Sequence, residues 1–156
     1  MGPHRLEGHD VTDERSLLEL PRAESLLLLA SVPVGRLVFT HQALPAIRPV
    51  NHIVDNDKIV IGLTPGSAIA GSTSQGGTVV AYEADSLDVT TRQGWTVVVV
   101  GLARLESEAD AVRYRSTLRP WLAGAMTDII SISAEIVTGY RLIPAAPSAA
   151  GDRVQV

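Results

Sequence analysis

The feature that most restricts the fold of this chain is a series of β-branched runs that follow one another along the sequence. Six runs are predicted to be strands, at residues 35–41, 46–54, 58–63, 77–85, 94–106 and 132–143. Strands that are adjacent in sequence pair antiparallel, whereas a parallel sheet needs a regular alternation with helices that is missing here. The fifth run is long and contains Gly101, which indicates a bulge or a bend. We therefore expect a mainly β (α+β) fold in which the strands form a closed or partly closed barrel.

Short helices and two polar tails complete the expected organisation. Helices are predicted at three places, residues 21–31, a turn or two within 64–73, and 107–118. Pro21 suits the first turn of a helix, and Ser107 with Asp110 forms a capping-box pattern. The remaining segments are two flexible tails and one domain between them, at residues 1–16, 145–156 and 17–144.

Composition excludes several functional classes. The net charge is −4, whereas proteins that bind nucleic acid need a clustered basic surface. The absence of cysteine excludes disulfides and thiolate chemistry. The apolar runs are shorter than the ~20 residues that span a bilayer, and the start of the chain lacks the order of a signal peptide. We expect a soluble cytoplasmic protein without nucleic-acid or membrane partners.

The usual catalytic patterns are absent from the sequence. His41 and His52 lie on adjacent predicted strands and could form a metal pair, but no third ligand is evident, so no metal is predicted. No serine lies in a nucleophile-elbow pattern. The run from Gly66 to Thr73 approaches a phosphate-binding loop, but Ser72 stands where that loop needs lysine. A Gly-Ser turn that opens a short helix still offers hydroxyl and N–H groups that suit an anion.

The second run, "AIRPVNHIV", contains a proline that a central strand does not tolerate. Pro49 cannot donate a ladder hydrogen bond, so we predict that its nitrogen faces an edge or a ligand and has no strand partner there.

The sequence leaves the roles of the two tryptophans open. Trp95 begins a strand and Trp121 follows a helix, and each suits either the core or the wall of a site for a flat ligand.

Taken in order, six motifs resemble the pyridoxamine 5'-phosphate oxidase-like flavin-binding proteins, and the small actinobacterial-type members most. The motifs are "LLASVPVGRLVF", "LPAIRPVNHIVD", "IVIGLTPGS", "VVAYEADSLD", "GWTVVVVGLA" and "EIVTGYRL". Each motif is weak alone, but their order and spacing are specific for the family. The resemblance covers most of the chain, about residues 23–143, and implies a six-stranded split β-barrel that works as a homodimer.

The resemblance also implies a cofactor and a set of residues that would bind it. Two FMN molecules would lie at the dimer interface, and the protein would be an FMN-dependent oxidoreductase that acts on an unknown small molecule. The residues implied as contacts of the flavin ring, its phosphate or its walls are Arg48, Pro49, Val50, Asn51, Thr64, Gly66, Ser67, Trp95 and Trp121.

The sequence departs from the family in the expected phosphate site. A lysine or arginine commonly follows the turn glycine in the family, but residues 66–70 contain no cation. Arg36 or Arg48 would then have to compensate from neighbouring strands.

Two alternative functions stay open. One is a non-catalytic ligand-binding split-barrel dimer that has lost FMN and holds a deazaflavin, haem or a fatty acid, with His52 or His41 as the haem ligand. The other is a structural or regulatory dimer without a small ligand.

Overall fold

The computed structural model describes residues 15–64, 66–119 and 128–144. In chain order, the elements of these residues are β1 (Arg15–Leu20), α1 (Arg22–Ala30), β2 (Val34–His41), β3 (Leu44–Asp55), β4 (Lys58–Leu63), α2 (Ala70–Ser74), β5 (Thr78–Asp88), β6 (Gln93–Leu105), α3 (Glu108–Arg115), β7 (Asp128–Ser133) and β8 (Ile136–Pro144).

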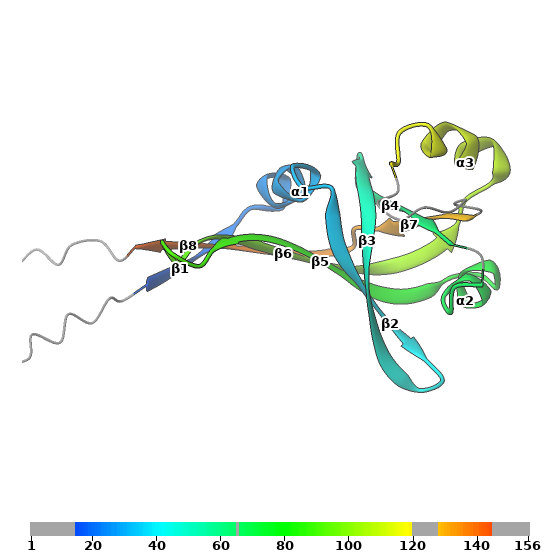
Figure 1. Ribbon diagram of the computed structural model, residues 1–156, viewed down its shortest axis with the longest axis horizontal. Helices are drawn as coiled ribbons and strands as arrows, with labels where there is room; N and C mark the ends of the chain where they lie inside the picture. Colours follow the sequence, from blue (N-terminus) through cyan, green and yellow to red (C-terminus); the bar gives the residue numbers. More distant parts are fainter. Residues whose placement is uncertain (1–14, 65, 120–127, 145–156) are drawn as a thin grey trace, which may run out of the picture.

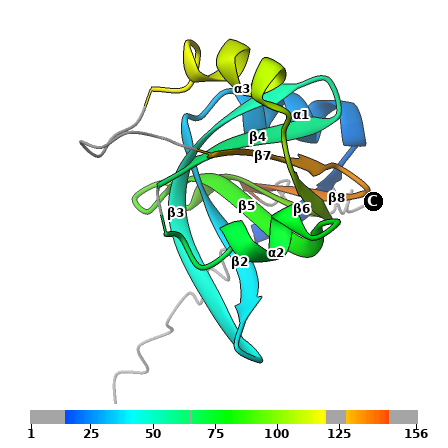
Figure 2. The ribbon, with the colours of Figure 1, turned by 90° about the vertical axis from the view of Figure 1, so that its right-hand side faces the viewer.

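The strands form the closed six-stranded antiparallel barrel that the sequence predicts. The sheet runs in the order β1-β8-β6-β5-β2-β3-β4-β7, and a further pairing of β7 with β6 closes it. The barrel therefore consists of β2 to β7, as the end-on view in Figure 2 shows. β1 and β8 lie outside the closed ring and extend the sheet into a long arm with parts of β5 and β6 (Figure 1).

Two boundaries differ from the sequence prediction. The last predicted strand, residues 132–143, is two strands, and β7 rather than β8 closes the barrel. The predicted tail at residues 1–16 is also too long, because β1 begins at Arg15 and pairs with β8 over its whole length. Both errors concern strands whose partners lie far away in sequence, so local patterns do not reveal them. Residues 1–14 and the second tail lie outside the described part of the chain.

Gly101 allows β6 to change partners in the middle of its length. β6 pairs with β8 up to Val100 and with β7 from Ala103 onward. A Cβ atom at Gly101 would clash with the carbonyl oxygen of Ser133, at the corner between β7 and β8. The predicted bend at this glycine is therefore the place where the barrel closes.

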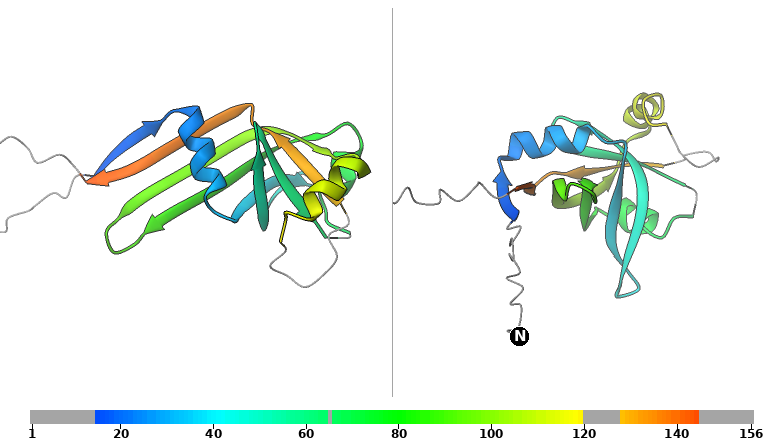
Figure 3. Two further views of the ribbon diagram at one scale, coloured as in Figure 1. Left: turned by 90° about the horizontal axis from the view of Figure 1, so that it is seen from above. Right: turned by 60° about the vertical axis from the view of Figure 1, so that its left-hand side comes forward.

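The predicted helices are present, and two of them are shorter than expected. α1 crosses one face of the arm above β8 and β6, as seen from above in Figure 3, and it buries Leu29 in the barrel core. The backbone N–H of Asp110 donates to Ser107 Oγ at 3.3 Å, so α3 begins with the predicted cap. α2 is a single turn of five residues. Among the described residues, every helix is too short or too polar to cross a membrane.

Candidate functional site

The nitrogen of Pro49 faces the unpaired edge of β3, as predicted. Along residues 44–51, β3 pairs with β2 alone, and β4 pairs only with residues 52–55. The N–H of His52 donates to Pro33 O at 3.0 Å. Hydrogen-bonded and non-bonded pairs alternate along an antiparallel ladder, so the pair Arg36–Pro49 is of the non-bonded kind. No strand of the described chain pairs with residues 44–51 of β3 on the side to which this nitrogen points.

Strand alternation divides the four residues predicted to contact the ring. Arg48 lies opposite Leu37, which is fully buried, whereas Pro49 lies opposite Arg36 on the outer face of the sheet. Successive side chains of a strand point to opposite faces. The side chains of Arg48 and Val50 therefore leave the strand on its core side, and those of Pro49 and Asn51 leave it on the outer side. A single flat ligand can meet all four only if some of them contribute backbone atoms.

The residues predicted to contact phosphate form a tight turn after β4. Gly66 has a φ of +74°, and the N–H of Ser67 donates to Thr64 O at 3.3 Å. That N–H therefore stabilises the turn and is less available to an anion than the sequence suggested. The hydroxyl of Ser67 differs, because its oxygen is buried and has no hydrogen-bond partner within the described chain. A Cβ at Gly66 would meet open space, so the turn borders a region that a ligand can reach.

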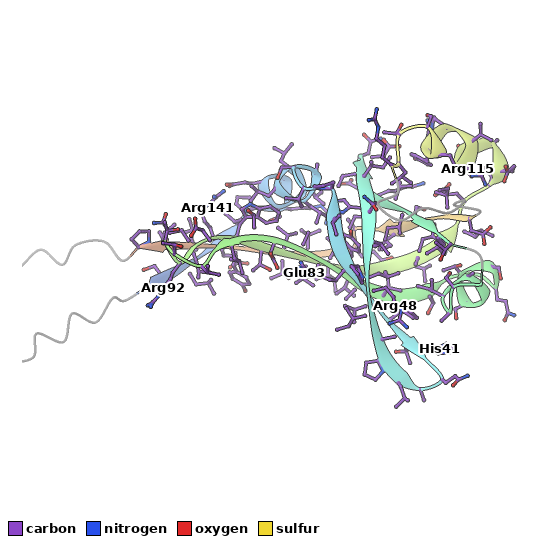
Figure 4. All side chains as sticks on the ribbon, in the orientation of Figure 1. His41, Arg48, Glu83, Arg92, Arg115 and Arg141 are labelled. Atoms are coloured by element: carbon purple, nitrogen blue, oxygen red, sulfur yellow. The ribbon has the colours of Figure 1, made fainter. Side chains whose placement is uncertain are left out.

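The two arginines proposed to replace the missing cation have different surroundings. Arg36 Nη1 donates to Glu83 Oε2 and Asp85 Oδ2, each at 3.2 Å. Burial, followed by the hydrogen bond and charge of Asp85, raises the pKa of Glu83 despite the nearby guanidinium. Arg48 is exposed, and its Nη1 donates to the carbonyl oxygen of the preceding residue at 2.8 Å. Arg48 therefore has no competing carboxylate in that contact, and it lies at the base of the β2–β3 ribbon in Figure 4.

The structure also places the tryptophans and histidines. Trp95 is 7% exposed and belongs to the barrel core, which favours the core alternative left open by the sequence. Trp121 lies outside the described residues. His41 is exposed at the tip of the β2–β3 ribbon (Figure 4), and its partner in the ladder is Leu44. His52 lies toward the other end of β3, so the two histidines are on adjacent strands, as the sequence predicts, but they are far apart along the ribbon.

A buried hydrogen-bonded chain around His52 was not found from sequence. His52 Nε2 lies 2.7 Å from Leu29 O, and His52 Nδ1 lies 2.6 Å from Tyr82 Oη. Desolvation lowers the pKa of His52, and burial raises the pKa of Tyr82 far above its ordinary value. Gly35 makes room for this contact, since a Cβ there would lie 2.5 Å from Tyr82 Oη. A glycine inside a strand was the only available signal of such a close approach.

A cleft of about 670 Å³ lies elsewhere, between the end of α1, the last part of β3 and α3. On its α3 side, Tyr114 Oη donates to Asp55 Oδ2 at 2.6 Å and accepts from Arg113 at 3.0 Å. None of the described residues predicted to bind flavin lines this cleft. The edge of β3 is instead an open surface, which would need a second surface to enclose a ligand.

Comparison with known proteins identifies one matching family and several solved structures with a similar fold. The family model described as pyridoxamine 5'-phosphate oxidase matches residues 21–150. The uncharacterized protein Rv0080 of Mycobacterium tuberculosis is 49% identical over 133 residues, which cover 83% of this chain and 88% of that protein.

Two solved structures resemble the chain over most of its length. The FAD binding protein from Mycobacterium smegmatis has a TM-score of 0.62 and 27% identity, over 81% of this chain and 98% of that one. A conserved protein of unknown function from Corynebacterium diphtheriae has a TM-score of 0.63 and 26% identity, with the same shares covered.

Proposed function

The chain belongs to the pyridoxamine 5'-phosphate oxidase family, and from this premise we propose that it binds a flavin nucleotide, FMN in the first place, without a covalent bond. The proposed activity is that of an oxidoreductase acting on a small molecule. The observation that carries the proposal is the edge of β3 at Pro49, which has no strand partner and so offers backbone to a ligand. The FAD binding protein from Mycobacterium smegmatis, at 27% identity, supports a flavin.

The turn after β4 fits the phosphate of such a nucleotide. Ser67 Oγ is buried without a hydrogen-bond partner in the described chain, and a buried hydroxyl without a partner is costly. A phosphate oxygen would satisfy it. The open space beside Gly66 leaves room for the approach. The residues present therefore fit a flavin phosphate, although no cation lies in residues 66–70.

Arg48 is the better replacement for the missing cation. Its guanidinium contacts a neutral carbonyl oxygen, whereas Arg36 is shared between the carboxylates of Glu83 and Asp85. Moving Arg36 to a phosphate would leave these two carboxylates without their counter-charge. We therefore assign the phosphate contact to Arg48 and the ring contacts to the edge of β3 from Pro49 to Asn51.

The same proposal includes a homodimer, because an apolar row on the outer face of the sheet is uncovered. One row of laterally paired residues crosses five strands on this face, from Ile47 through Val38, Ala81 and Val100 to Ile136. The two end residues are 58% and 62% exposed. A continuous, exposed apolar row of this kind is a typical interaction surface. A second copy placed there would cover it and would also enclose the open edge of β3.

Within this proposal, the flavin supplies hydride or electron transfer, and the protein binds and orients it. Ser67 and Arg48 hold the phosphate, and the β3 edge aligns the ring. Trp95 supports the barrel from inside rather than contacting the flavin, since it is buried in the core. No side chain has to act as a general acid for this division of work.

The test begins with the absorption spectrum of freshly purified protein, followed by mass analysis of any released chromophore. Apo protein is then titrated with FMN and with FAD, and the binding constant and the melting temperature are measured. Replacing Arg48 by Ala should weaken flavin binding about tenfold to a hundredfold, the effect of one charge-assisted hydrogen bond. Arg92→Ala is the control, since Figure 4 shows Arg92 at the opposite end of the molecule. Colourless protein whose melting temperature neither flavin changes would refute the proposal.

The second candidate is a ligand-binding barrel dimer that does not use flavin. The absence of a cation in residues 66–70 favours it. His52 does not favour its haem version, because both ring nitrogens already have partners at 2.6 and 2.7 Å. A chromophore other than FMN or FAD in the mass spectrum would support this candidate, and a bound flavin would exclude it.

A further inference from the structure

The hydrogen-bonded chain around His52 connects two strands, β5 and β3, and the helix α1 through the inside of the barrel. Tyr82 belongs to β5, which pairs with β2, and β2 pairs in turn with β3. Its side chain passes below β2 at Gly35 and reaches His52 on β3. Beyond His52, the chain ends on the carbonyl oxygen of Leu29 in α1. Tyr82 and His52 thus tie β3 to elements with which this part of β3 does not share a ladder.

The chemistry of the contacts fixes the direction of each hydrogen bond. Leu29 O can only accept, so His52 Nε2 carries a proton and donates. In the neutral imidazole Nδ1 is then an acceptor, and the Tyr82 hydroxyl donates to it. Tyr82 Oη also lies 3.4 Å from Val50 O, so the hydroxyl touches β3 on both sides of Asn51.

The chain acts at the point where β3 changes its strand partner. Up to Asn51 the strand has only β2 beside it, and from His52 it pairs with β4. A strand held by one neighbour is less fixed than a central strand. Tyr82 and His52 supply a second attachment at this transition. The two residues lie next to the edge that is assigned to the flavin ring.

We propose that Tyr82 and His52 are positioning residues that hold the Pro49–Asn51 edge of β3 in the geometry needed to bind the flavin ring. This inference rests on the proposed function. Neither side chain reaches the ligand in this account, because both are buried in the barrel interior. They act through the backbone of Val50 and through His52 itself.

The test compares two tyrosines that lose only a hydroxyl. Tyr82→Phe removes the donor to His52, whereas Tyr114→Phe removes an equally well bonded hydroxyl on the α3 side. We expect Tyr82→Phe to weaken flavin binding about three- to tenfold and to shift the absorption bands of the bound flavin. The Tyr114→Phe protein should bind flavin as the wild type does, even if its melting temperature falls by as much.

A second pair of variants keeps the inference testable if Tyr82→Phe folds poorly. His52→Gln retains a donor for Leu29 O and an acceptor for the Tyr82 hydroxyl, whereas His52→Leu retains neither. Flavin affinity should be largely preserved in the glutamine variant and reduced in the leucine variant. Equal affinities of these two variants, or equal losses in the two tyrosine variants, would overturn the positioning role.

Hydrogen exchange in apo protein separates this inference from the proposed function. The amide of His52 donates to Pro33 O, and it should exchange about tenfold faster in Tyr82→Phe than in Tyr114→Phe. If wild-type protein binds no flavin but this difference is found, the proposed function fails and the anchoring of β3 stands. If flavin binds but the two variants exchange alike, the anchoring fails alone.

Discussion

Pro49 and His52 are three residues apart on β3, and their surroundings are opposite. Pro49 is exposed on an edge that no strand of the described chain covers, so its missing N–H leaves no strand partner without a hydrogen bond. His52 is 5% exposed, and each of its ring nitrogens has a partner. The proline is thus the residue that leaves the strand open to a ligand. The histidine is the residue that ties the strand to the core.

The neutral form of His52 makes the stability of the fold depend on pH. Desolvation lowers the pKa of His52 in the folded protein below the ordinary value of 6.5. The unfolded chain therefore binds its proton first as the pH falls, so stability is lost below pH 6.5 until the folded pKa is passed. Measuring the free energy of unfolding from pH 7.5 to 5 should show this loss in wild type. The loss should be smaller in His52→Gln, and equal slopes in the two proteins would contradict the prediction.

At the scale of elements, the barrel depends on strands that change partners. β6 pairs with β8 along its first half and with β7 along its second half. β3 pairs with β2 alone up to Asn51 and with β4 from His52. A different residue makes each change of partner possible. At Gly101 the missing side chain admits the carbonyl oxygen of Ser133. At His52 a buried side chain adds a further attachment where β3 passes from β2 to β4.

Replacing Gly101 by Ala should damage the closure of the barrel. The added methyl group would clash with backbone rather than with a flexible side chain, so we expect a loss of about 3 kcal/mol in the free energy of unfolding. Gly71→Ala is the matched control, because a Cβ there meets nothing within 4 Å and the position is helical. Its effect should be within about 1 kcal/mol and stabilising. Urea titrations of both variants measure the difference, and a harmless Gly101→Ala would refute this account.

At the scale of the whole molecule, the chain covers the inner apolar face of the sheet but not the apolar row on its outer face. Inner residues such as Leu37, Tyr82 and Val99 are fully or almost fully buried in the barrel. The outer row through Ala81 and Val100 has no element of the described chain across it. The proposed second copy would therefore both enclose the open site at β3 and cover the apolar row.

A charge placed in this row should dissociate the proposed dimer. Burying a lysine in an apolar interface costs several kcal/mol, so Val100→Lys should raise the dimer dissociation constant about a hundredfold or more. Val112→Lys is the control, because Val112 is already 59% exposed on α3. Light scattering coupled to size exclusion gives the mass of each variant. A wild-type monomer, or a Val100→Lys dimer as tight as that of wild type, would contradict the proposal.

The sequence by itself determined the barrel and the edge position of Pro49. Both follow from local rules, since β-branched runs form strands and a proline without an N–H avoids a central position. The cap at Ser107 and the bend at Gly101 have the same origin. The order of the six family motifs predicted the family, and the family comparison confirms it.

Only the tertiary structure decided which strands close the barrel, which face each side chain takes and which groups meet inside. Strand pairing depends on segments that are distant in sequence, so the division into β7 and β8 and the pairing of β1 were missed. Arg48 and Pro49 are neighbours in sequence, but the pleat places them on opposite faces. Tyr82 meets His52 because β2 lies between their strands and has glycine at the crossing. Contacts of this kind require the packed barrel, because no local pattern encodes them.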